Sequence, residues 1–428
     1  MAAAATSVDL MLIICVPTAL EVCLYEYRAG ISSSQSAGVD STMLISERFA
    51  QQHDTAVAAM QKQHATQVLF VSHSSDYGVF KVGSHHLTRE LARMGLDVAH
   101  ISTPYSLMHM LFARHPERSR LSRAGVRVDD AGVKHLLPRT VLPAQYSTSS
   151  YLSKAFRAVG MQRPRLVFVD QPLMLCEALF ELGAVTVFRP TDLYFNRAAR
   201  LLQLKYVKRF DAVAATSEEV LAALPSVAGQ KRTVIPNGVE YSRFVTAEGT
   251  AVRSGAVYVG ALDNRFDWQA VLSMAQAFPG LKISVVGPVA TTVPDLPVNI
   301  ELRGPMPYRD IPHYLAGFSI GLLPLSADPS NVGRSPMKLF EYLAAGLQVV
   351  ATGVPGLTSR SDLPGCFFYT DSTKAPAALA RAMKIQGINA AGREAARAQD
   401  WREKARQLLR FAQSSALPAT VGANCVAK

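Results

Sequence analysis

Short apolar segments alternate with helical stretches along most of the chain, and this alternation constrains the fold more than any other feature. The first series begins at residue 67 with "QVLFVSHSSD" and includes the strand-like segments "RLVFVD", "VTVFRP" and "DAVAAT". Helical stretches lie between these segments, among them "LMLCEALFELG" at 173–183 and "SEEVLAALPSV". Strands and helices in this order predict parallel sheets that helices cover on both faces. We therefore expect an α/β protein.

A turn signal divides the alternation into two series. "VIPNGVEYSRF" places Pro236, Asn237 and Gly238 together, which favours a connection between domains. A second series follows, with strands expected at "AVYVG", "KISVVG", "NIELRG", "SIGLLPL" and "LQVVAT". Two doubly wound halves of this kind place a crevice at the carboxyl ends of their strands, where open sheets bind ligands. The sequence thus predicts two Rossmann-like domains that face a central crevice.

The predicted domains occupy residues 67–238 and 239–398. A chain of 428 residues, 49% of them hydrophobic, is long enough to bury two ordinary cores. A last helix is expected near residues 401–412, and it has an apolar face but no neighbouring strand. We therefore expect residues 399–428 to form a crossover helix and tail that return to the first domain.

The segment before the first strand has a different composition. "LMLIICVPTALEVCLY" is its longest apolar stretch, and Pro17 and Glu21 interrupt it before it reaches the length of a membrane span. We expect residues 1–66 to be a poorly ordered leader or a weak anchor. The five cysteines include no CxxC pair, which argues against a zinc site or a disulfide framework and favours a reducing, cytoplasmic setting.

The segment "SPMKLFEYLAAGLQVVAT" predicts a helix that starts at the crevice. Its first turn contains Ser335, Pro336 and Met337, whose position at a helix N-terminus favours a diphosphate, and Lys338 adds a mobile positive charge. Glu341 lies one turn further along the same face, where its carboxylate can accept hydrogen bonds from two ribose hydroxyls. This spacing predicts a nucleotide-diphosphate clamp. An ordinary amphipathic helix with an exposed Lys–Glu pair is the alternative.

The net charge of the chain favours anionic partners. Lys and Arg number 44 against 33 Asp and Glu, which gives a formal charge of +11. Charge by itself leaves a non-catalytic module that binds nucleotides or nucleic acid as an alternative of another class. The sequence has no helix-turn-helix, RRM or basic ribbon with interleaved aromatic residues, so we expect no nucleic acid partner.

The helix segment, together with "VIPNGVEYSRF", "YVGALDNRFDW" and "IPHYLAGFSIGLLPLS", resembles the GT-B glycosyltransferases, especially family 4 and the GumK-like β-glucuronosyltransferases that build xanthan-type polysaccharide. The resemblance covers residues 67–413. In the first domain, "FVSHSSDYGVFKVGSHHLTREL", "GVKHLLPRTVLPAQ" and "VFRPTD" are similar to the GumK family. This likeness implies the GT-B fold and a metal-independent enzyme without a bound cofactor.

The resemblance also implies a reaction and a catalytic residue. The GumK-like family implies transfer of glucuronate from UDP-glucuronate, with inversion, to a lipid-diphosphate-linked oligosaccharide in exopolysaccharide synthesis. Its catalytic base falls on Asp192, and a carboxylate just past a strand end can take a proton from an acceptor hydroxyl. Asp192 could instead cap the following helix. A retaining family 4 hexosyltransferase that uses UDP-glucose or GDP-mannose is the alternative, and in it Asp192 is not the base.

Three residues of the second domain bear on donor binding. Gly260 follows a predicted strand, where a glycine lets the backbone approach a phosphate closely. Arg265 in "LDNRFDW" is similar to the family 4 pattern and could meet the diphosphate, meet a sugar carboxylate or cap its helix. Leu325 stands where the GumK family has a tyrosine, so the likeness implies uracil recognition less strongly than diphosphate binding.

An apolar segment followed by arginines points to a membrane. "SLMHMLF" directly precedes a basic stretch that includes Arg118, Arg120 and Arg123. Such a stretch is either a solvated charged face or a peripheral patch, in which apolar side chains enter the interface and arginines meet anionic headgroups. An acceptor carried on a lipid diphosphate requires the second. We therefore expect an anionic membrane surface as a partner, on the inner face of the cell membrane.

Overall fold

The computed structural model describes residues 65–73, 81–111, 116–146, 150–245, 253–358 and 362–415. By their internal contacts, residues 65–428 form one compact unit, and all the described residues belong to it. The leader or weak anchor expected at residues 1–66 lies outside the described residues, apart from its last two positions. Within the described ranges, every helix is too short or too polar to span a bilayer.

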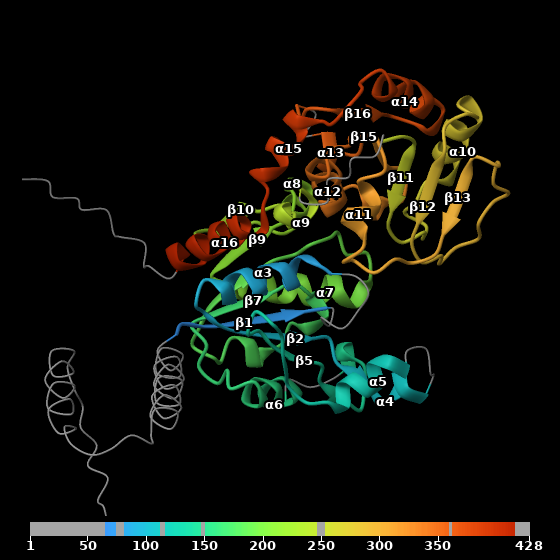
Figure 1. Ribbon diagram of the computed structural model, residues 1–428. Coiled ribbons are helices and arrows are strands. Elements are labelled where there is room, and N and C mark those ends of the chain that lie inside the picture. Colours follow the sequence, from blue (N-terminus) through green and yellow to red (C-terminus); the bar gives the residue numbers. More distant parts are fainter. Residues whose placement is uncertain are drawn as a thin grey trace, which may run out of the picture. The chain divides into compact units, whose positions relative to one another are not determined.

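The first part of this unit is built on an eight-stranded sheet with the order β10-β9-β8-β7-β1-β2-β5-β4 (Figure 1). All neighbours are parallel except β4 and β5. Its strands are β1 (Gln67–Ser72), β2 (Asp97–Ser102), β4 (Arg127–Val128), β5 (Lys134–Leu136), β7 (Leu166–Val169), β8 (Val185–Phe188), β9 (Ala212–Ala215) and β10 (Lys231–Val234). The central strands are buried almost throughout, because helices cover both faces of a parallel sheet.

Helices and short 3-10 turns connect these strands. The helices are α3 (Gly83–Arg93), α4 (Leu107–Leu111), α5 (Pro116–Arg123), α6 (Ser150–Ala158), α7 (Arg197–Tyr206) and α8 (Glu218–Ala222). Helix α9 (Tyr241–Val245) follows the last strand, β10, and its Phe244 belongs to a core of the second sheet. The 3-10 turns are η2 (Ala144–Tyr146), η3 (Pro172–Met174), η4 (Glu177–Leu179) and η5 (Val207–Arg209). A separate two-stranded parallel sheet joins β3 (Tyr105–Ser106) to β6 (Arg139–Thr140).

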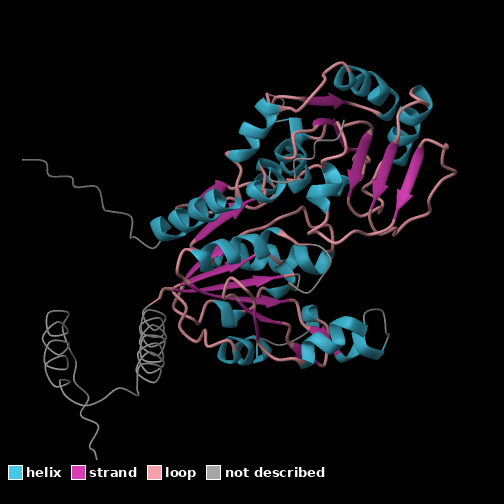
Figure 2. Cartoon of the chain, in the orientation of Figure 1, coloured by secondary structure: helices cyan, strands magenta, loops and turns pink. Residues whose placement is uncertain are grey.

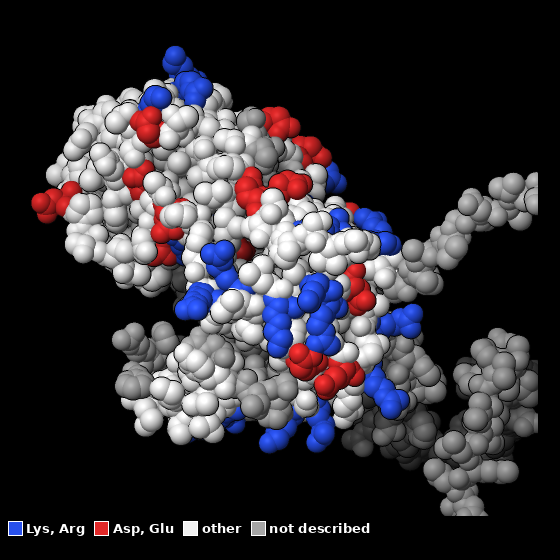
Figure 3. Space-filling model, turned by 180° about the vertical axis from the view of Figure 1, so that it is seen from behind, with Lys and Arg blue, Asp and Glu red and all other residues white. Residues whose placement is uncertain are grey.

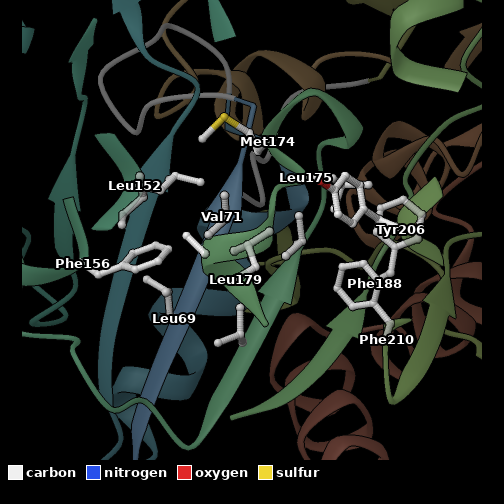
Figure 4. Close-up of a cluster of buried hydrophobic side chains, with 14 of the residues drawn as sticks. Leu69, Val71, Leu152, Phe156, Met174, Leu175, Leu179, Phe188, Tyr206 and Phe210 are labelled. Carbon is white, nitrogen blue, oxygen red and sulfur yellow. The ribbon is translucent and has the colours of Figure 1, made fainter. Parts of the chain in front are cut away.

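The helix expected over 173–183 is wrong. The structure has η3 and η4 there, because Leu175 and Cys176 between them are extended rather than helical. The extended link lets Met174 and Leu179 both reach the core beneath the sheet, where they are at most 1% exposed (Figure 4). Core packing therefore outweighs the helical propensity of this segment.

The second part is a six-stranded parallel sheet with the order β13-β12-β11-β14-β15-β16. Its strands are β11 (Ala256–Val259), β12 (Ile283–Val286), β13 (Ile300–Arg303), β14 (Ile320–Leu323), β15 (Gln348–Thr352) and β16 (Cys366–Tyr369). Its helices are α10 (Trp268–Ala277), α11 (Ile311–Leu315), α12 (Met337–Ala344), α13 (Pro355–Thr358), α14 (Ala375–Met383) and α15 (Ala390–Arg397), with 3-10 turns η6 (Pro329–Asn331) and η7 (Ser372–Lys374). Two separate cores, one on each face, make it doubly wound. Figure 2 shows its strands and the helices around them.

The last described helix, α16 (Trp401–Ser415), packs on the first sheet rather than the second. Its buried side chains belong to the same core as Val68 and Phe70 of β1, and it lies along α3 (Figure 1). The crossover expected for this helix is confirmed. The domain limits expected at 238 and 398 stay predictions, because residues 65–428 form one compact unit by their contacts.

Candidate functional site

A cavity of about 350 Å³ lies where the carboxyl ends of strands from both sheets meet. In the first sheet, successive strands are added outward on one side of β1 and on the other side of β7. In the second sheet, they are added outward in the same way from β11 and from β14. Each pair is a topological switch point, which is where open α/β sheets bind ligands. His73 and Asp170 line the cavity from the first switch point, and Gly260 and Leu325 line it from the second.

The N-terminus of α12 forms one wall of the cavity. Ser335, Pro336, Met337 and Lys338 all line it, as the sequence predicted. Pro336 is the N-cap and supplies no side-chain hydrogen bond, so no side chain from the cap covers the first-turn N–H groups. The wall therefore presents backbone donors and one lysine to the cavity, an arrangement suited to an anion.

Two arginines reinforce this positive wall. Arg265 lines the cavity with its Nε donating to Oδ2 of Asp263 at 3.0 Å. Arg334 lines it too, and burial lowers the pKa of Arg334, with the charge of Arg265 as a second cause. Such mutual repulsion between two partly buried cations is relieved when an anion binds between them. Arg334 was not predicted from the sequence, although its place directly before "SPMK" was a usable signal.

Arg265 does not cap α10, which was one of the roles expected for it. Asp267 is the N-cap, and its side chain accepts a hydrogen bond from the backbone N–H of Ala270 at 3.0 Å. The side chain of Arg265 is turned instead to Asp263 and the cavity. Its contact with a diphosphate or a sugar carboxylate stays a prediction.

Glu341 is not part of the cavity wall. Its side chain is 3% exposed and accepts a long hydrogen bond, 3.4 Å, from the hydroxyl of Tyr308. Burial raises the pKa of Glu341, and the charge of Lys338 opposes that shift. The structure therefore places Glu341 beside the predicted clamp but behind its surface, and the ribose contact expected for it stays a prediction.

Asp192 lines the cavity at the end of β8 and does not cap the next helix. Asn196 caps α7 instead, because its side chain accepts hydrogen bonds from the N–H groups of Ala198 and Ala199. The Asp192 carboxylate accepts a hydrogen bond from Thr191 Oγ1 at 2.9 Å. It faces the same cavity as the positive wall, so a base at this position would stand opposite a bound diphosphate.

A buried polar chain links the carboxyl end of the first sheet to the start of α12. Arg189, completely buried, approaches Asp170 Oδ2 at 3.4 Å and donates to Asn237 Oδ1 at 3.0 Å. Asn237 in turn donates its Nδ2 to the Ser335 carbonyl at 2.9 Å and its backbone N–H to Ser335 Oγ at 3.1 Å. The predicted turn that contains Asn237 therefore also holds Ser335 in place at the start of α12, where the predicted clamp begins.

Gly260 and Leu325 both line the cavity. A Cβ on Gly260 would collide with the ring and hydroxyl of Tyr258, so packing already requires a glycine at this position. Leu325 is 6% exposed and its backbone N–H donates to Thr352 Oγ1 at 2.8 Å. The expected approach of a phosphate to Gly260 stays a prediction.

The arginines expected at a membrane lie away from the cavity, on α5. Arg120 and Arg123 are exposed, whereas the side chain of Arg118 lies outside the described part of the structure. Figure 3 shows one face of the molecule. On this face Lys and Arg side chains form groups, and Asp and Glu side chains lie beside only some of these groups. Among the described residues, no cluster of three or more His, Cys, Asp or Glu side chains could hold a metal.

No family model matches the chain. A stretch of 240 residues is 29% identical to TuaH of Bacillus subtilis (strain 168), which is named as a putative teichuronic acid biosynthesis glycosyltransferase. The match covers 50% of this chain and 60% of TuaH, so the chain spans less than two thirds of that relative.

Solved glycosyltransferase structures share the architecture over most of the chain. Sucrose-phosphate synthase from Thermosynechococcus elongatus matches with a TM-score of 0.63 and 15% identity, over 82% of this chain and 98% of its own. HepE from Anabaena, solved with UDP and glucose, matches with a TM-score of 0.59 and 16% identity, over 82% of this chain and 100% of its own. The chain therefore has the GT-B fold that the sequence predicted.

Proposed function

We propose that the protein is a glycosyltransferase that uses a nucleotide-sugar donor and transfers glucuronate from UDP-glucuronate, with inversion, to a lipid-linked oligosaccharide. The observation that carries the proposal is a single cavity in which the positive wall of α12, Arg265 and Arg334 faces the carboxylate of Asp192. The UDP and glucose bound to HepE, and the name of TuaH, support a sugar nucleotide as the donor.

Asp192 on one side of the cavity and the α12 N-terminus on the other have different roles in the proposed reaction. Asp192 takes the proton of the acceptor hydroxyl while the hydroxyl oxygen forms a bond to the anomeric carbon. The bond from that carbon to the diphosphate breaks on the opposite side, which inverts the configuration. The α12 N-terminus and Lys338 then stabilise the negative charge that develops on the departing UDP.

A second candidate is a retaining hexosyltransferase that uses UDP-glucose. The observation that favours it is the likeness to HepE, which was solved with UDP and glucose. It shares the donor clamp with the first candidate but gives Asp192 no role as a base. The anomeric configuration of the product separates the two.

UDP is expected to stabilise the wild-type protein more than the Lys338→Ala variant. At about a hundred times its dissociation constant, UDP adds about 2.7 kcal/mol to the free energy of unfolding. Loss of one charged contact to phosphate weakens binding by about 1.5 to 3 kcal/mol, so most of that gain disappears in the variant. Thermal shift with UDP, UDP-glucose, UDP-glucuronate and GDP-mannose measures both the clamp and the donor preference.

The matched control is Lys384→Ala, since Lys384 is exposed and outside the cavity. Equal stabilisation of the wild type, the control and Lys338→Ala by UDP would contradict the clamp. A wild-type protein that none of the four nucleotides stabilises would contradict the proposed function.

An exposed apolar patch supports the proposed membrane partner. Its side chains come from α4 and from the segment after β6, and they are between 43% and 73% exposed: Leu107, Met108, Leu111, Val141, Leu142 and Tyr146. Because β3 and β6 pair in parallel, the segments that follow them leave the small sheet in the same direction. The exposed Arg120 and Arg123 of α5 follow α4 in the chain. Apolar side chains with nearby arginines suit an anionic membrane surface.

Charge reversal of the α5 arginines is expected to abolish vesicle binding without affecting the donor site. Each arginine near an anionic surface contributes about 1 kcal/mol, so Arg118→Glu, Arg120→Glu and Arg123→Glu together remove the attraction and add repulsion. Flotation with vesicles that contain phosphatidylserine measures binding, and thermal shift with UDP measures the donor site. The control reverses three exposed basic residues elsewhere, Arg309, Lys384 and Arg397. Vesicle binding that both triple variants retain would show that α5 does not contact the membrane.

A further inference from the structure

Besides Asp192 and the Asp263 that pairs with Arg265, the cavity is lined by a further carboxylate, which the proposed reaction does not use. Asp170 follows β7 directly, lines the cavity and is 1% exposed. Its Oδ2 atom has two long contacts, with Ser72 Oγ and with Arg189 Nη1, both at 3.4 Å. Its Oδ1 atom is buried and has no hydrogen-bond partner in the described structure. A buried carboxylate oxygen without a donor is costly, so this atom is prepared to accept a hydrogen bond from a ligand.

A second unpartnered atom faces the same cavity from the neighbouring strand. His73 follows β1, which pairs in parallel with β7, and its Nδ1 atom is buried without a hydrogen-bond partner within the described residues. Burial raises the pKa of Asp170, while the charges of Arg189 and of His73 oppose that shift. Asp170 and His73 follow neighbouring parallel strands and line the same cavity. An acceptor and an imidazole nitrogen therefore stand together at the first switch point.

The chemistry of these two groups excludes a phosphate and fits hydroxyls. A carboxylate only accepts hydrogen bonds when ionised, and it repels anions. A hydroxyl can donate to the carboxylate and also exchange a hydrogen bond with an imidazole nitrogen in either tautomer. Neighbouring hydroxyl groups are the defining feature of a sugar ring.

We propose that Asp170 and His73 form a subsite that binds hydroxyl groups of a sugar. The identity of the sugar as donor or acceptor rests on the proposed function, but the hydroxyl subsite itself does not. We assign the binding of sugar hydroxyls to Asp170 and the uptake of the proton to Asp192. The buried cation Arg189 contacts the carboxylate of Asp170, whereas the carboxylate of Asp192 accepts its hydrogen bond from the neutral hydroxyl of Thr191.

The test replaces one oxygen of the subsite. Asp170→Asn keeps the size of the side chain but removes the charge, and a hydrogen bond to a charged group is worth about 10-fold or more in affinity. Calorimetry compares UDP, UDP-glucose, UDP-glucuronate and the glycolipid-like probe octyl β-glucoside. Because Asp170 also contacts Arg189, which leads to the clamp through Asn237, the affinity for UDP is the reference. We expect the affinity for one class of sugar-bearing probe to fall about 10-fold more than the affinity for UDP. Weaker UDP-sugar binding assigns the subsite to the donor, and weaker octyl β-glucoside binding assigns it to the acceptor.

His73→Gln is the second variant, because it removes the imidazole without touching the ion pair of Asp170 and Arg189. It should weaken the same probe as Asp170→Asn, and melting temperatures verify that both variants fold. Unchanged affinity of both variants for every probe would overturn the proposal, as would an equal loss for UDP and UDP-sugars. If the wild type binds no nucleotide, the proposed function fails, and the subsite is then decided by octyl β-glucoside alone.

Discussion

Asp192→Asn is expected to lower turnover by roughly 10² to 10⁴-fold, because asparagine keeps the size of the side chain but cannot take a proton from the acceptor. The affinity for UDP and the melting temperature should stay close to those of the wild type. The fold does not depend on this carboxylate, since Asn196 rather than Asp192 caps α7. Turnover is measured as UDP release in the presence of a glycolipid acceptor.

The product must be examined together with the rate. A β-linked product from an α-linked donor, read by proton NMR from the coupling constant at the new linkage, supports the inverting reaction. The control is Asp295→Asn, because Asp295 is exposed and outside the cavity. An active Asp192→Asn variant, or a product that keeps the α configuration, would transfer the assignment to the retaining hexosyltransferase.

Trp401→Ala is expected to lower the free energy of unfolding by about 3 to 5 kcal/mol, the usual range for removing a large buried aromatic side chain. Trp401 is 1% exposed and its ring stacks on His86 of α3, with centroids 5.0 Å apart. A Cβ added to Gly83 would lie 3.2 Å from the Trp401 ring, so the first turn of α3 is packed closely against it. Neighbouring groups cannot easily fill the space that alanine would leave.

Chemical denaturation measures this effect, with Arg402→Ala as the matched control on the exposed side of the same helix. A loss below about 1 kcal/mol would mean that α16 adds little to the first core. Because Gly83 also lies beside Asn237 and Arg189, we expect Trp401→Ala to weaken UDP binding as well. Arg402→Ala should change neither quantity.

The sequence predicted most of the strands that bury apolar runs and missed several short strands at or near the sheet edges, β5 and β16 among them. The central strands consist mainly of Val, Leu, Ile, Phe and Ala, and the structure confirms them. β10 and β4 were not predicted, because they are short and carry exposed charges such as Lys231 and Arg127. Both are edge strands, where charged residues are common and the apolar pattern is weak.

Some features of the candidate site could also be predicted from the sequence, and others could not. Ser335, Met337, Lys338, Gly260, Arg265 and Asp192 all line one cavity, because each lies where an element begins or ends at the carboxyl edge of a sheet. The contacts among Asp170, Arg189 and Asn237 could not be predicted, since they join segments far apart in the chain. Periodicity describes one segment at a time and carries no information on such contacts.

The position of α16 has a consequence for how the protein is made. The core of the first sheet contains residues from β1, which leave the ribosome early, and Trp401, Leu408 and Ala412, which leave it more than 300 residues later. At about 5 to 20 residues per second, the nascent sheet would expose apolar surface for on the order of tens of seconds before this helix arrives. A chain that stops short of α16 would keep that surface exposed and be a target for chaperones and proteases. Only a chain translated through α16 can finish its first domain.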